Sequence, residues 1–305
     1  MRAFKILLFI IFTSFFLMTC SEDIMNTNKN NIPYRNNFIP GTTIKITNKY
    51  EWASHPLCYS QNFIIYTNSK NFKIFKLFNE ELSSPFFDPK RYFNSYAFTT
   101  DISDDGYLLF DIATGPQTYE TYYIGFDDKE PKFLLYGDTP SIYGNLYGKY
   151  NIAYCKDESI YITDIYNSEP IFVDGPGCNG APNWSNDGRY LVYTKHDNVL
   201  NSDILIINNI INKTKIDLYK SNYIAWPRFS PDDKWISFEM PSPKTNVNVI
   251  WLISINGGDP KQLVEYPYEP YLDQDGVWTH DWTPDGKWII YDIDGYELWK
   301  VRVFE

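Results

Sequence analysis

The sequence predicts an all-β protein built from six copies of one unit, and three observations carry this prediction. Aromatic residues make up 18% of the 305 residues, which suits strands packed on both faces better than a helical bundle. A four-residue apolar core recurs at 63–66, 107–110, 151–154, 190–193, 235–238 and 288–291. The last residues of these cores are 44, 44, 39, 45 and 53 residues apart. A period of about 40 to 50 residues, with several strands in each unit, is typical of a β-propeller.

Each copy supplies further strands around its core. The cores themselves are continuously apolar, as expected for strands that are buried on both faces. A second apolar strand follows every core, at 72–77, 121–126, 160–165, 203–207, 249–255 and 296–303. A third strand follows in the first five copies and is clearest at 132–136, 170–173, 215–219 and 261–264. The sixth copy has no third strand of its own in this sequence.

An alternating strand at 42–47 stands before the first copy and belongs to none of the six units. Pairing it with the sixth copy would close the ring and cover an edge that could otherwise aggregate. We therefore expect a six-bladed β-propeller of four-stranded blades, with the last blade closed by the N-terminal strand. This propeller forms a single domain over residues 40–305.

The start of the chain has the pattern of an export signal. Arg2 and Lys5 precede a 13-residue apolar run at 6–18, which is shorter than the roughly 20 residues that a membrane-spanning helix needs. We therefore expect a signal peptide at 1–19. Six of the twelve residues at 26–37 are Asn, so the segment 20–39 is expected to be a solvated, Asn-rich tether.

The end of this signal resembles the lipobox of bacterial lipoproteins. The residues are Leu-Met-Thr-Cys at 17–20, with Thr19 where Gly, Ala or Ser is usual. The resemblance implies that Cys20 becomes lipid-modified, begins the mature chain and anchors it to a membrane. Ordinary signal cleavage near Cys20 is the alternative. The acidic stretch at 21–23 is similar to export tags on surface lipoproteins, so either a periplasm-facing or a surface location in the envelope is open.

Charge and cysteine content exclude several classes of partner and site. The formal net charge is -11, which repels phosphate backbones, so nucleic acid is not an expected partner. Cys58, Cys155 and Cys178 have neither metal-ligand spacing nor the spacing of a disulfide framework. We expect buried free thiols, although pairing of Cys155 with Cys178 is left open. No cofactor or metal is expected.

Three stretches resemble the repeat of TolB-like β-propellers. They are Ala-Pro-Asn-Trp-Ser-Asn-Asp-Gly-Arg-Tyr-Leu-Val-Tyr at 181–193, Trp-Pro-Arg-Phe-Ser-Pro-Asp-Asp-Lys-Trp at 226–235, and the segment 249–263. The match is specific in blades four to six, partial in blade two and degenerate in blades one and three. The resemblance implies a six-bladed propeller in an exported protein that binds other macromolecules. TolB also has an N-terminal domain before its propeller, where this chain has only a tether, so the specific partners of TolB are not carried over.

The aspartates that recur before the cores are interpreted as structural. They are Asp104, Asp105, Asp187, Asp232, Asp233 and Asp285. In a Ser-Pro-Asp-Gly turn, Pro fixes φ, Asp bonds to local backbone and Gly supplies a positive φ. Copies spaced around a ring also cannot converge on one substrate. We therefore expect them to form hairpin turns.

Two of the three histidines could share a site. His55 and His280 precede the inner strand in blades one and six, which become neighbours when the ring closes, and Asp281 is adjacent. These residues could form an acid/base pair or a metal site, and similar histidines serve in propeller lyases that act on uronic acid polymers. A polar channel lining is the alternative. His196 is expected in an exposed hairpin loop. The sequence has no GxSxG, HExxH or P-loop motif.

Loop lengths point to one face of the ring as the binding face. With the core counted as the second strand of its blade, the connections from second to third strand and from blade to blade are long. Both kinds emerge on the same face. Repeat proteins usually place insertions on their binding face. The candidate residues on this face are Trp226, Arg228, Tyr266, Tyr268, Tyr271 and Trp278. We therefore expect a monomeric, non-enzymatic platform for an envelope protein or polysaccharide. An enzyme that acts on polysaccharide or peptide with His55, His280 and Asp281 is the alternative.

Overall fold

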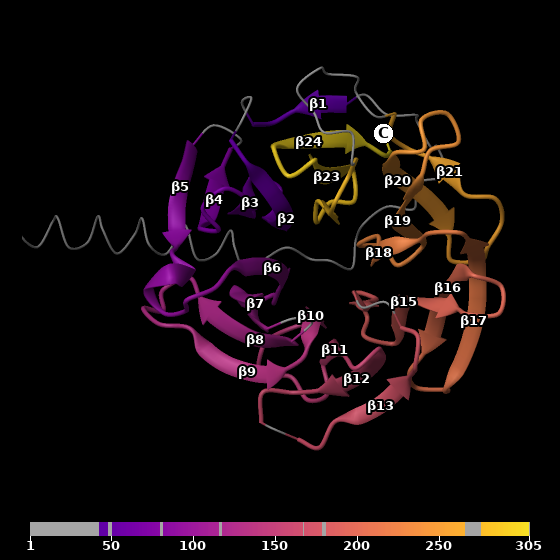
Figure 1. The fold of residues 1–305 in the computed structure, drawn as a ribbon, viewed down its shortest axis with the longest axis horizontal. Helices are drawn as coiled ribbons and strands as arrows, with labels where there is room; N and C mark the ends of the chain where they lie inside the picture. Colours follow the sequence, from indigo (N-terminus) through magenta and orange to yellow (C-terminus); the bar gives the residue numbers. More distant parts are fainter. Residues whose placement is uncertain are drawn as a thin grey trace, which may run out of the picture. The chain divides into compact units, whose positions relative to one another are not determined.

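A computed structural model describes residues 43–47, 51–79, 82–115, 118–166, 168–178, 181–265 and 276–304. They form six antiparallel sheets of four strands, arranged as blades around a central axis (Figure 1). The predicted signal peptide, the predicted tether and Cys20 lie outside the described residues. Among those residues, the one helical element is the 3₁₀ turn η2 (Pro89–Arg91). None of them forms a helix that is long and apolar enough to cross a membrane.

Blades one to three are built in chain order from the inside outward. Blade one contains β2 (Ala53–Ser60), β3 (Phe63–Asn68), β4 (Ile74–Phe78) and β5 (Leu82–Phe87). Blade two contains β6 (Ala97–Ile102), β7 (Tyr107–Gly115), β8 (Thr118–Gly125) and β9 (Lys132–Tyr136). Blade three contains β10 (Asp138–Ile142), β11 (Ile152–Lys156), β12 (Ser159–Thr163) and β13 (Ile171–Asp174).

Blades four to six complete the ring. Blade four contains β14 (Asn183–Trp184), β15 (Tyr190–Asp197), β16 (Ser202–Asn209) and β17 (Thr214–Ser221). Blade five contains β18 (Ala225–Phe229), β19 (Trp235–Pro241), β20 (Asn248–Ser254) and β21 (Lys261–Gln262). Blade six contains β22 (His280–Trp282), β23 (Trp288–Ile293), β24 (Glu297–Arg302) and β1 (Thr43–Lys45). All six predicted cores lie on the second strand of a blade, which confirms the predicted fold.

The sixth blade is closed by the strand that precedes the first one. Thr43 pairs with Val301 and Lys45 pairs with Trp299 in an antiparallel ladder between β1 and β24. The Lys45 ammonium lies 2.6 Å from a carboxylate oxygen of Glu297, whose side chain is fully buried. The backbone N–H of Leu298 donates to the Thr47 hydroxyl at 2.9 Å. The predicted closure by an N-terminal strand is therefore confirmed.

The apolar core lies between the blades rather than in one central mass. One cluster packs Ala53, Ile64 and Tyr66 of blade one against Ile290 and Leu298 of blade six. Other clusters join neighbouring blades in the same way around the ring. The second strands are buried on both faces because a blade covers each side of them, which explains why their sequences do not alternate.

The repeated Asp-Gly segments are turns that hold the first and second strands of a blade together. In blade four the Ser185 hydroxyl donates to the Asp187 carboxylate at 2.8 Å and accepts the N–H of Tyr190 at 2.9 Å. The same arrangement recurs at Ser103, Ser230 and Thr283 in blades two, five and six. Asp105, Asp187, Asp232 and Asp285 are therefore engaged in local turn geometry, as their spacing predicted. Asp233 instead accepts the backbone N–H groups of Asn186 and Asp187 in blade four.

The three cysteines that the structure describes are free and buried. The thiol of Cys155 donates to the carbonyl oxygen of Cys178 at 3.9 Å, so these two residues meet without forming a disulfide. Burial raises the pKa of the Cys178 thiol to about 12. A protonated, buried thiol packs as a small apolar side chain.

Candidate binding face and channel

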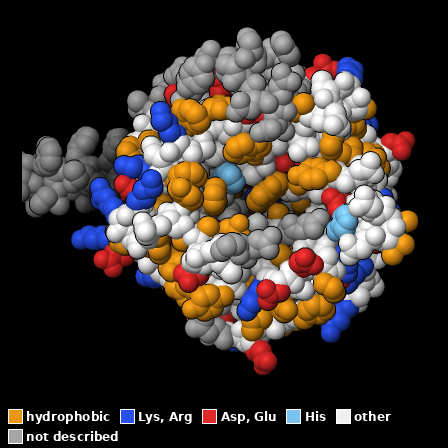
Figure 2. All heavy atoms as spheres, viewed as in Figure 1, with side chains coloured by type: hydrophobic (Ala, Val, Ile, Leu, Met, Phe, Trp, Pro, Cys, Tyr) orange, Lys and Arg blue, Asp and Glu red, His pale blue; other side chains and the backbone are white. Residues whose placement is uncertain are grey.

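The connections from second to third strand and from blade to blade emerge on the same side of the ring, which we call the loop-rich face. Tight Asp-Gly turns lie on the opposite face. The innermost strands β2, β6, β10 and β18 surround the axis in Figure 1, and hydrophobic side chains gather around the central hollow in Figure 2. The mouth of this central channel is therefore where residues from several blades can meet.

Four equivalent residues, three on innermost strands and one just before such a strand, share an unusual backbone at this mouth. They are His55, Thr139, Ala181 and Trp226, with φ of 51°, 47°, 49° and 47°, and we call them the rim residues. Each is followed by proline, and the ladders of β2, β10 and β18 shift register beside them. Bulges with a left-handed residue redirect side chains and concentrate at functional sites. The left-handed residue repeats in four blades and the register shift in three of them, which marks the rim as a built feature.

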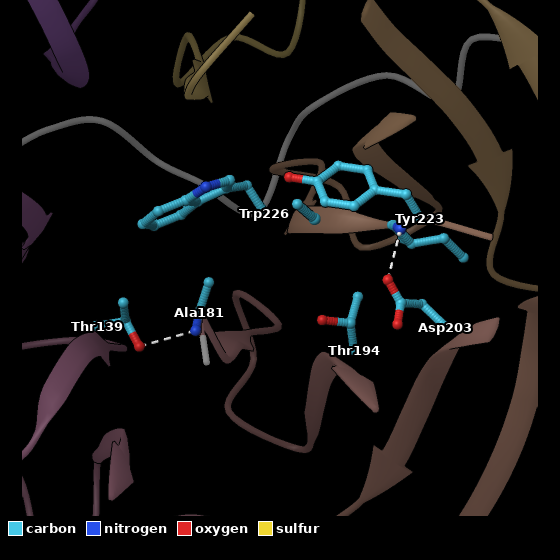
Figure 3. A pocket seen from close by; sticks show the side chains of 8 residues that line it. Thr139, Ala181, Thr194, Asp203, Tyr223 and Trp226 are labelled. Carbon is cyan, nitrogen blue, oxygen red and sulfur yellow. Dashed lines mark hydrogen bonds between the residues drawn. The ribbon is translucent and has the colours of Figure 1, made fainter. Parts of the chain in front are cut away.

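A cavity of about 260 Å³ opens beside the rim between blades three, four and five. It is lined by Thr139, Ala181, Thr194, Asp203, Tyr223, Ile224, Ala225 and Trp226. Figure 3 shows the Trp226 and Tyr223 rings along one side and Thr194 and Ala181 on the other. The Thr139 hydroxyl accepts the N–H of Ala181 at 2.8 Å, and Asp203 accepts the N–H of Ile224 at 3.0 Å. These bonds fix the two ends of the cavity.

Thr194 places a hydroxyl inside this cavity. Its side chain is 1% exposed, and in Figure 3 its oxygen points into the open space. Within the described part of the chain, this hydroxyl makes no hydrogen bond. This oxygen is not among the buried polar atoms that lack a partner, so it is accessible from the cavity. The Thr194 hydroxyl is therefore available to a ligand.

Arg228 crosses the central channel from blade five to blade two. It is 9% exposed, its guanidinium donates to the carbonyl oxygen of Thr100 at 3.0 Å, and it lies 4.0 Å from the Asp101 carboxylate. Burial raises the pKa of Asp101, and the Arg228 charge opposes that rise. The pKa of Asp281 is raised to about 6 by burial and is likewise held down by Arg228. This arginine therefore neutralises acidic groups on both sides of the channel.

Polar side chains on the innermost strands link each blade to the next one. Asp281 accepts the N–H of Cys58 at 2.8 Å across the closing junction, and Asp101 accepts the N–H of Ile142 at 2.9 Å. Ser141 and Asn183 accept from Trp184 and Phe229 in the same way. These acceptors are part of the ring's structure, which accounts for the position of Asp281.

The structure does not gather His55, His280 and Asp281 into one cluster. All three lie on the innermost strands β2 and β22, but His280 and Asp281 are consecutive and point to opposite faces of β22. The His280 ring turns toward blade five, where it meets Glu239 at 3.1 Å and Ser237 at 2.8 Å. In the part of the chain that the structure describes, no group of three potential ligands is arranged to hold a metal.

His280 and Glu239 form a buried hydrogen-bonded pair. Burial lowers the pKa of His280 to about 3, with a further contribution from Arg228. Burial also raises the pKa of Glu239 well above its usual range. Burial therefore favours the uncharged form of both groups, with the Glu239 carboxyl at His280 Nδ1 and the Ser237 hydroxyl at Nε2. Both ring nitrogens are occupied, so this histidine does not serve as a base in the channel.

His55 lies at the channel mouth with an aromatic environment. Its ring centroid is 5.3 Å from that of Phe98 and 6.2 Å from that of Trp226. Burial lowers its pKa to about 4, with a smaller contribution from Arg228. Its Nδ1 atom is buried without a hydrogen-bond partner among the described residues. The nearby Asp292 binds the backbone N–H of His55 at 3.2 Å rather than its ring.

The residues predicted for the binding face do not all lie in the same part of the structure. Trp226 is a rim residue, and Trp278 is 39% exposed, whereas Arg228 lies inside the channel. Tyr266, Tyr268 and Tyr271 lie outside the described residues. His196 was expected in a loop, but it lies on β15 and its Nδ1 is 2.8 Å from Asp203, beside the cavity.

Sequence reasoning missed the cavity and most of the rim. Thr139, Ala181, Thr194 and Tyr223 were not singled out because none of them carries a chemical motif. A signal for the rim was present, since a proline follows the rim residue at about the blade period in blades three, four and five. Thr194 had no such signal, because its position beside the cavity is set only by the folded chain.

The comparisons with known proteins agree with the fold and cover the sequence only in part. No protein-family model matches the chain. It is 32% identical over 110 residues to the Tol-Pal system protein TolB of Francisella tularensis subsp. holarctica, strains OSU18 and LVS. That match covers 35% of this chain and 24% of each relative. The chain therefore matches about a quarter of the length of these curated relatives.

Solved structures with the same fold have diverse functions. TolB from Acinetobacter baumannii superimposes with a TM-score of 0.57 at 13% identity, over 79% of this chain and 59% of that one. An oligogalacturonate lyase in complex with manganese gives 0.56 at 12% identity, over 82% and 77%. A gluconolactonase from Xanthomonas campestris gives 0.59 at 7% identity, over 89% and 99%. The chain is a six-bladed β-propeller similar to TolB, and the fold alone does not separate a binding protein from an enzyme.

Proposed function

We propose that this chain is a non-enzymatic binding protein of the cell envelope whose loop-rich face receives a protein or a glycan. The observation that carries the proposal is the rim, where a residue with positive φ repeats in four blades, three of them with a bulge, beside an open, aromatic-lined cavity. Aromatic side chains held by a rigid backbone are effective anchors, since little conformational entropy is lost when they bind. The partial similarity to TolB, a Tol-Pal system protein, supports a binding role.

A propeller enzyme that acts on polysaccharide or peptide is the second candidate. The observation that favours it is the buried, unpartnered Nδ1 of His55 at the channel mouth. A catalytic histidine is normally oriented by a third group, whereas the described neighbours of the His55 ring are Phe98 and Trp226. His280 and Asp281 are occupied by structural hydrogen bonds. These contacts favour binding over catalysis.

A capture experiment tests the binding role. Full-length protein is immobilised and exposed to envelope extract from the source organism, and the double variant Trp226→Ala, Trp278→Ala is compared with wild type. Removing two aromatic anchors is expected to reduce recovery of the bound protein or glycan at least about tenfold. The matched control is Tyr166→Ala, which removes a 56% exposed aromatic side chain from the face opposite the loop-rich face.

Equal recovery by wild type and the double variant would contradict the proposal. The recovered material also tests the enzyme candidate. If wild type cleaves what it captures and His55→Ala does not, the second candidate is correct instead. A parallel replacement of residues 266–275 by a Gly-Ser segment tests whether the three tyrosines of that segment contribute.

We also propose that the protein is a monomer, exported by its signal peptide and tethered by a lipid on Cys20. The apolar run before Cys20 and the Asn-rich segment after it support this proposal. Labelling cells with a radioactive fatty acid is expected to mark wild type and not Cys20→Ala. A label retained by Cys20→Ala, or absent from wild type, would contradict lipidation at this residue. Size-exclusion chromatography tests the monomer.

A further inference from the structure

The geometry points to a neutral saccharide as the ligand of the cavity that Thr194, Tyr223 and Trp226 line. This inference rests on the proposed binding function and names the class of ligand for one part of the loop-rich face. Three properties of the cavity carry it, namely its flat aromatic side, its unpartnered hydroxyl and its charge.

The aromatic side of the cavity suits a sugar ring. The rings of Trp226 and Tyr223 lie side by side along it in Figure 3, and Tyr223 is 40% exposed. The apolar C–H face of a pyranose packs on such rings, while its hydroxyls remain at the edge. Trp226 is held in position by its positive φ of 47° and by the register shift in β18. The stacking surface therefore exists before the ligand arrives.

The opposite side supplies hydrogen bonds of the matching kind. A sugar hydroxyl both donates and accepts, so it can satisfy the Thr194 hydroxyl, which lacks a partner among the described residues. The Thr139 hydroxyl lies at the far end, where it already accepts the N–H of Ala181. A purely apolar ligand would leave the Thr194 hydroxyl unsatisfied, and that outcome is unfavourable.

The charge and the size of the cavity further restrict the class of ligand. The lining residues include the carboxylate of Asp203 and neither Lys nor Arg, and the whole chain carries a charge of -11. A uronate or a sugar phosphate would meet repulsion without a compensating cation. The volume of about 260 Å³ lies below the roughly 300–1,000 Å³ of pockets for drug-sized ligands. The cavity therefore takes a single neutral sugar ring, as a free sugar or the end of a glycan.

The test measures binding of defined sugars to the full-length protein. The neutral probes are glucose, galactose, mannose and N-acetylglucosamine, and the charged probes are galacturonate and glucose 6-phosphate. Saturation-transfer NMR and calorimetry are expected to detect at least one neutral probe and neither charged probe. Trp226→Ala is expected to abolish binding. Thr194→Val, which keeps the side-chain shape, is expected to raise the Kd about tenfold, the loss of one hydrogen bond.

Thr194→Val also separates a ligand contact from a structural role. Because the hydroxyl has no hydrogen-bond partner among the described residues, its removal is expected to leave the melting temperature unchanged or higher. A lower melting temperature would mean that the hydroxyl supports the fold, and would overturn its assignment to the ligand. Tyr166→Ala is the matched control, since it removes a 56% exposed aromatic side chain that does not line the cavity.

The outcomes distinguish this inference from the proposed function. If no neutral probe binds, or the charged probes bind equally well, the saccharide inference is wrong. The binding function then still stands if the double variant loses its captured partner. If neutral probes bind and Trp226→Ala abolishes that binding, the inference holds even where the extract yields no protein partner. Failure of both experiments removes both proposals.

Discussion

Arg228→Met is expected to destabilise the folded protein by about 3–5 kcal/mol, the range measured when one partner of a buried ion pair is removed. Arg228 is 9% exposed and crosses the channel to the carbonyl of Thr100 and the carboxylate of Asp101. Methionine retains the apolar stem but leaves Asp101 and Asp281 without their cation. Equilibrium denaturation in urea measures the loss directly.

The destabilisation by Arg228→Met should grow with pH. The pKa of Asp281 in the folded chain, about 6, is above its unfolded value of 3.8. A carboxyl with a raised pKa contributes stability that is fully present below the unfolded pKa and is lost as pH rises through the folded pKa. Removing Arg228 raises the pKa of Asp281 and Asp101 further, so the variant loses more stability at pH 8 than at pH 5.

The histidines change the result in the same direction. Arg228 lowers the pKa of His55 and His280. Its removal therefore favours their protonation and makes the destabilisation by Arg228→Met smaller at low pH. The other acidic neighbour, Glu239, has a pKa raised well above its usual range, and Arg228 opposes that rise too. The control is Arg189→Met, since Arg189 has a 59% exposed side chain and its loss is expected to leave the free energy of unfolding nearly unchanged. An Arg228→Met effect as small as this, or one that shrinks between pH 5 and 8, would contradict the role assigned to Arg228.

Deletion of residues 43–47 is expected to destabilise the propeller by at least about 4 kcal/mol and to cause aggregation. The deletion removes the ladder to β24, the hydroxyl that accepts the N–H of Leu298, and the ammonium beside buried Glu297. It also exposes the edge of β24 to other chains. Urea denaturation and size-exclusion chromatography measure the two effects.

Point variants in the same strand separate its contributions. Lys45→Met leaves Glu297 without the ammonium and is expected to account for about 3 kcal/mol of the loss. Ile44→Ala is the control, since Ile44 is 41% exposed and its truncation should cost no more than about 0.5 kcal/mol. A deletion variant as stable and monomeric as wild type would show that the ring does not depend on this closure.

The fold was predictable because each blade repeats the same burial pattern. Apolar runs at 107–110 and 288–291 mark strands that neighbouring blades cover on both sides, and the orphan strand at 42–47 had one place to pair. The shortest strands, β14 (Asn183–Trp184) and β21 (Lys261–Gln262), could not be delimited in this way. Two residues carry too little periodicity to set a boundary.

The candidate site was less predictable because it depends on which way single side chains point. The blade alignment put His280 and Asp281 in the right strand, but consecutive residues on a strand face opposite sides. Trp226 and Arg228 would share a face in a regular strand. The register shift between Ala225 and Arg228 separates them, so one lies at the mouth and the other inside the channel. A bulge of this kind has no counterpart in the hydrophobic pattern.

The closing ladder has a mechanical consequence. A pulling force on the chain before Thr43 reaches β1 before any other strand of the propeller, and there it acts on a ladder of three residue pairs. Because β1 lies on the outermost position of its blade, it can detach while the five blades formed by continuous chain keep their own strands. A protein held by its N-terminus and loaded through its loop-rich face would therefore yield first at this junction.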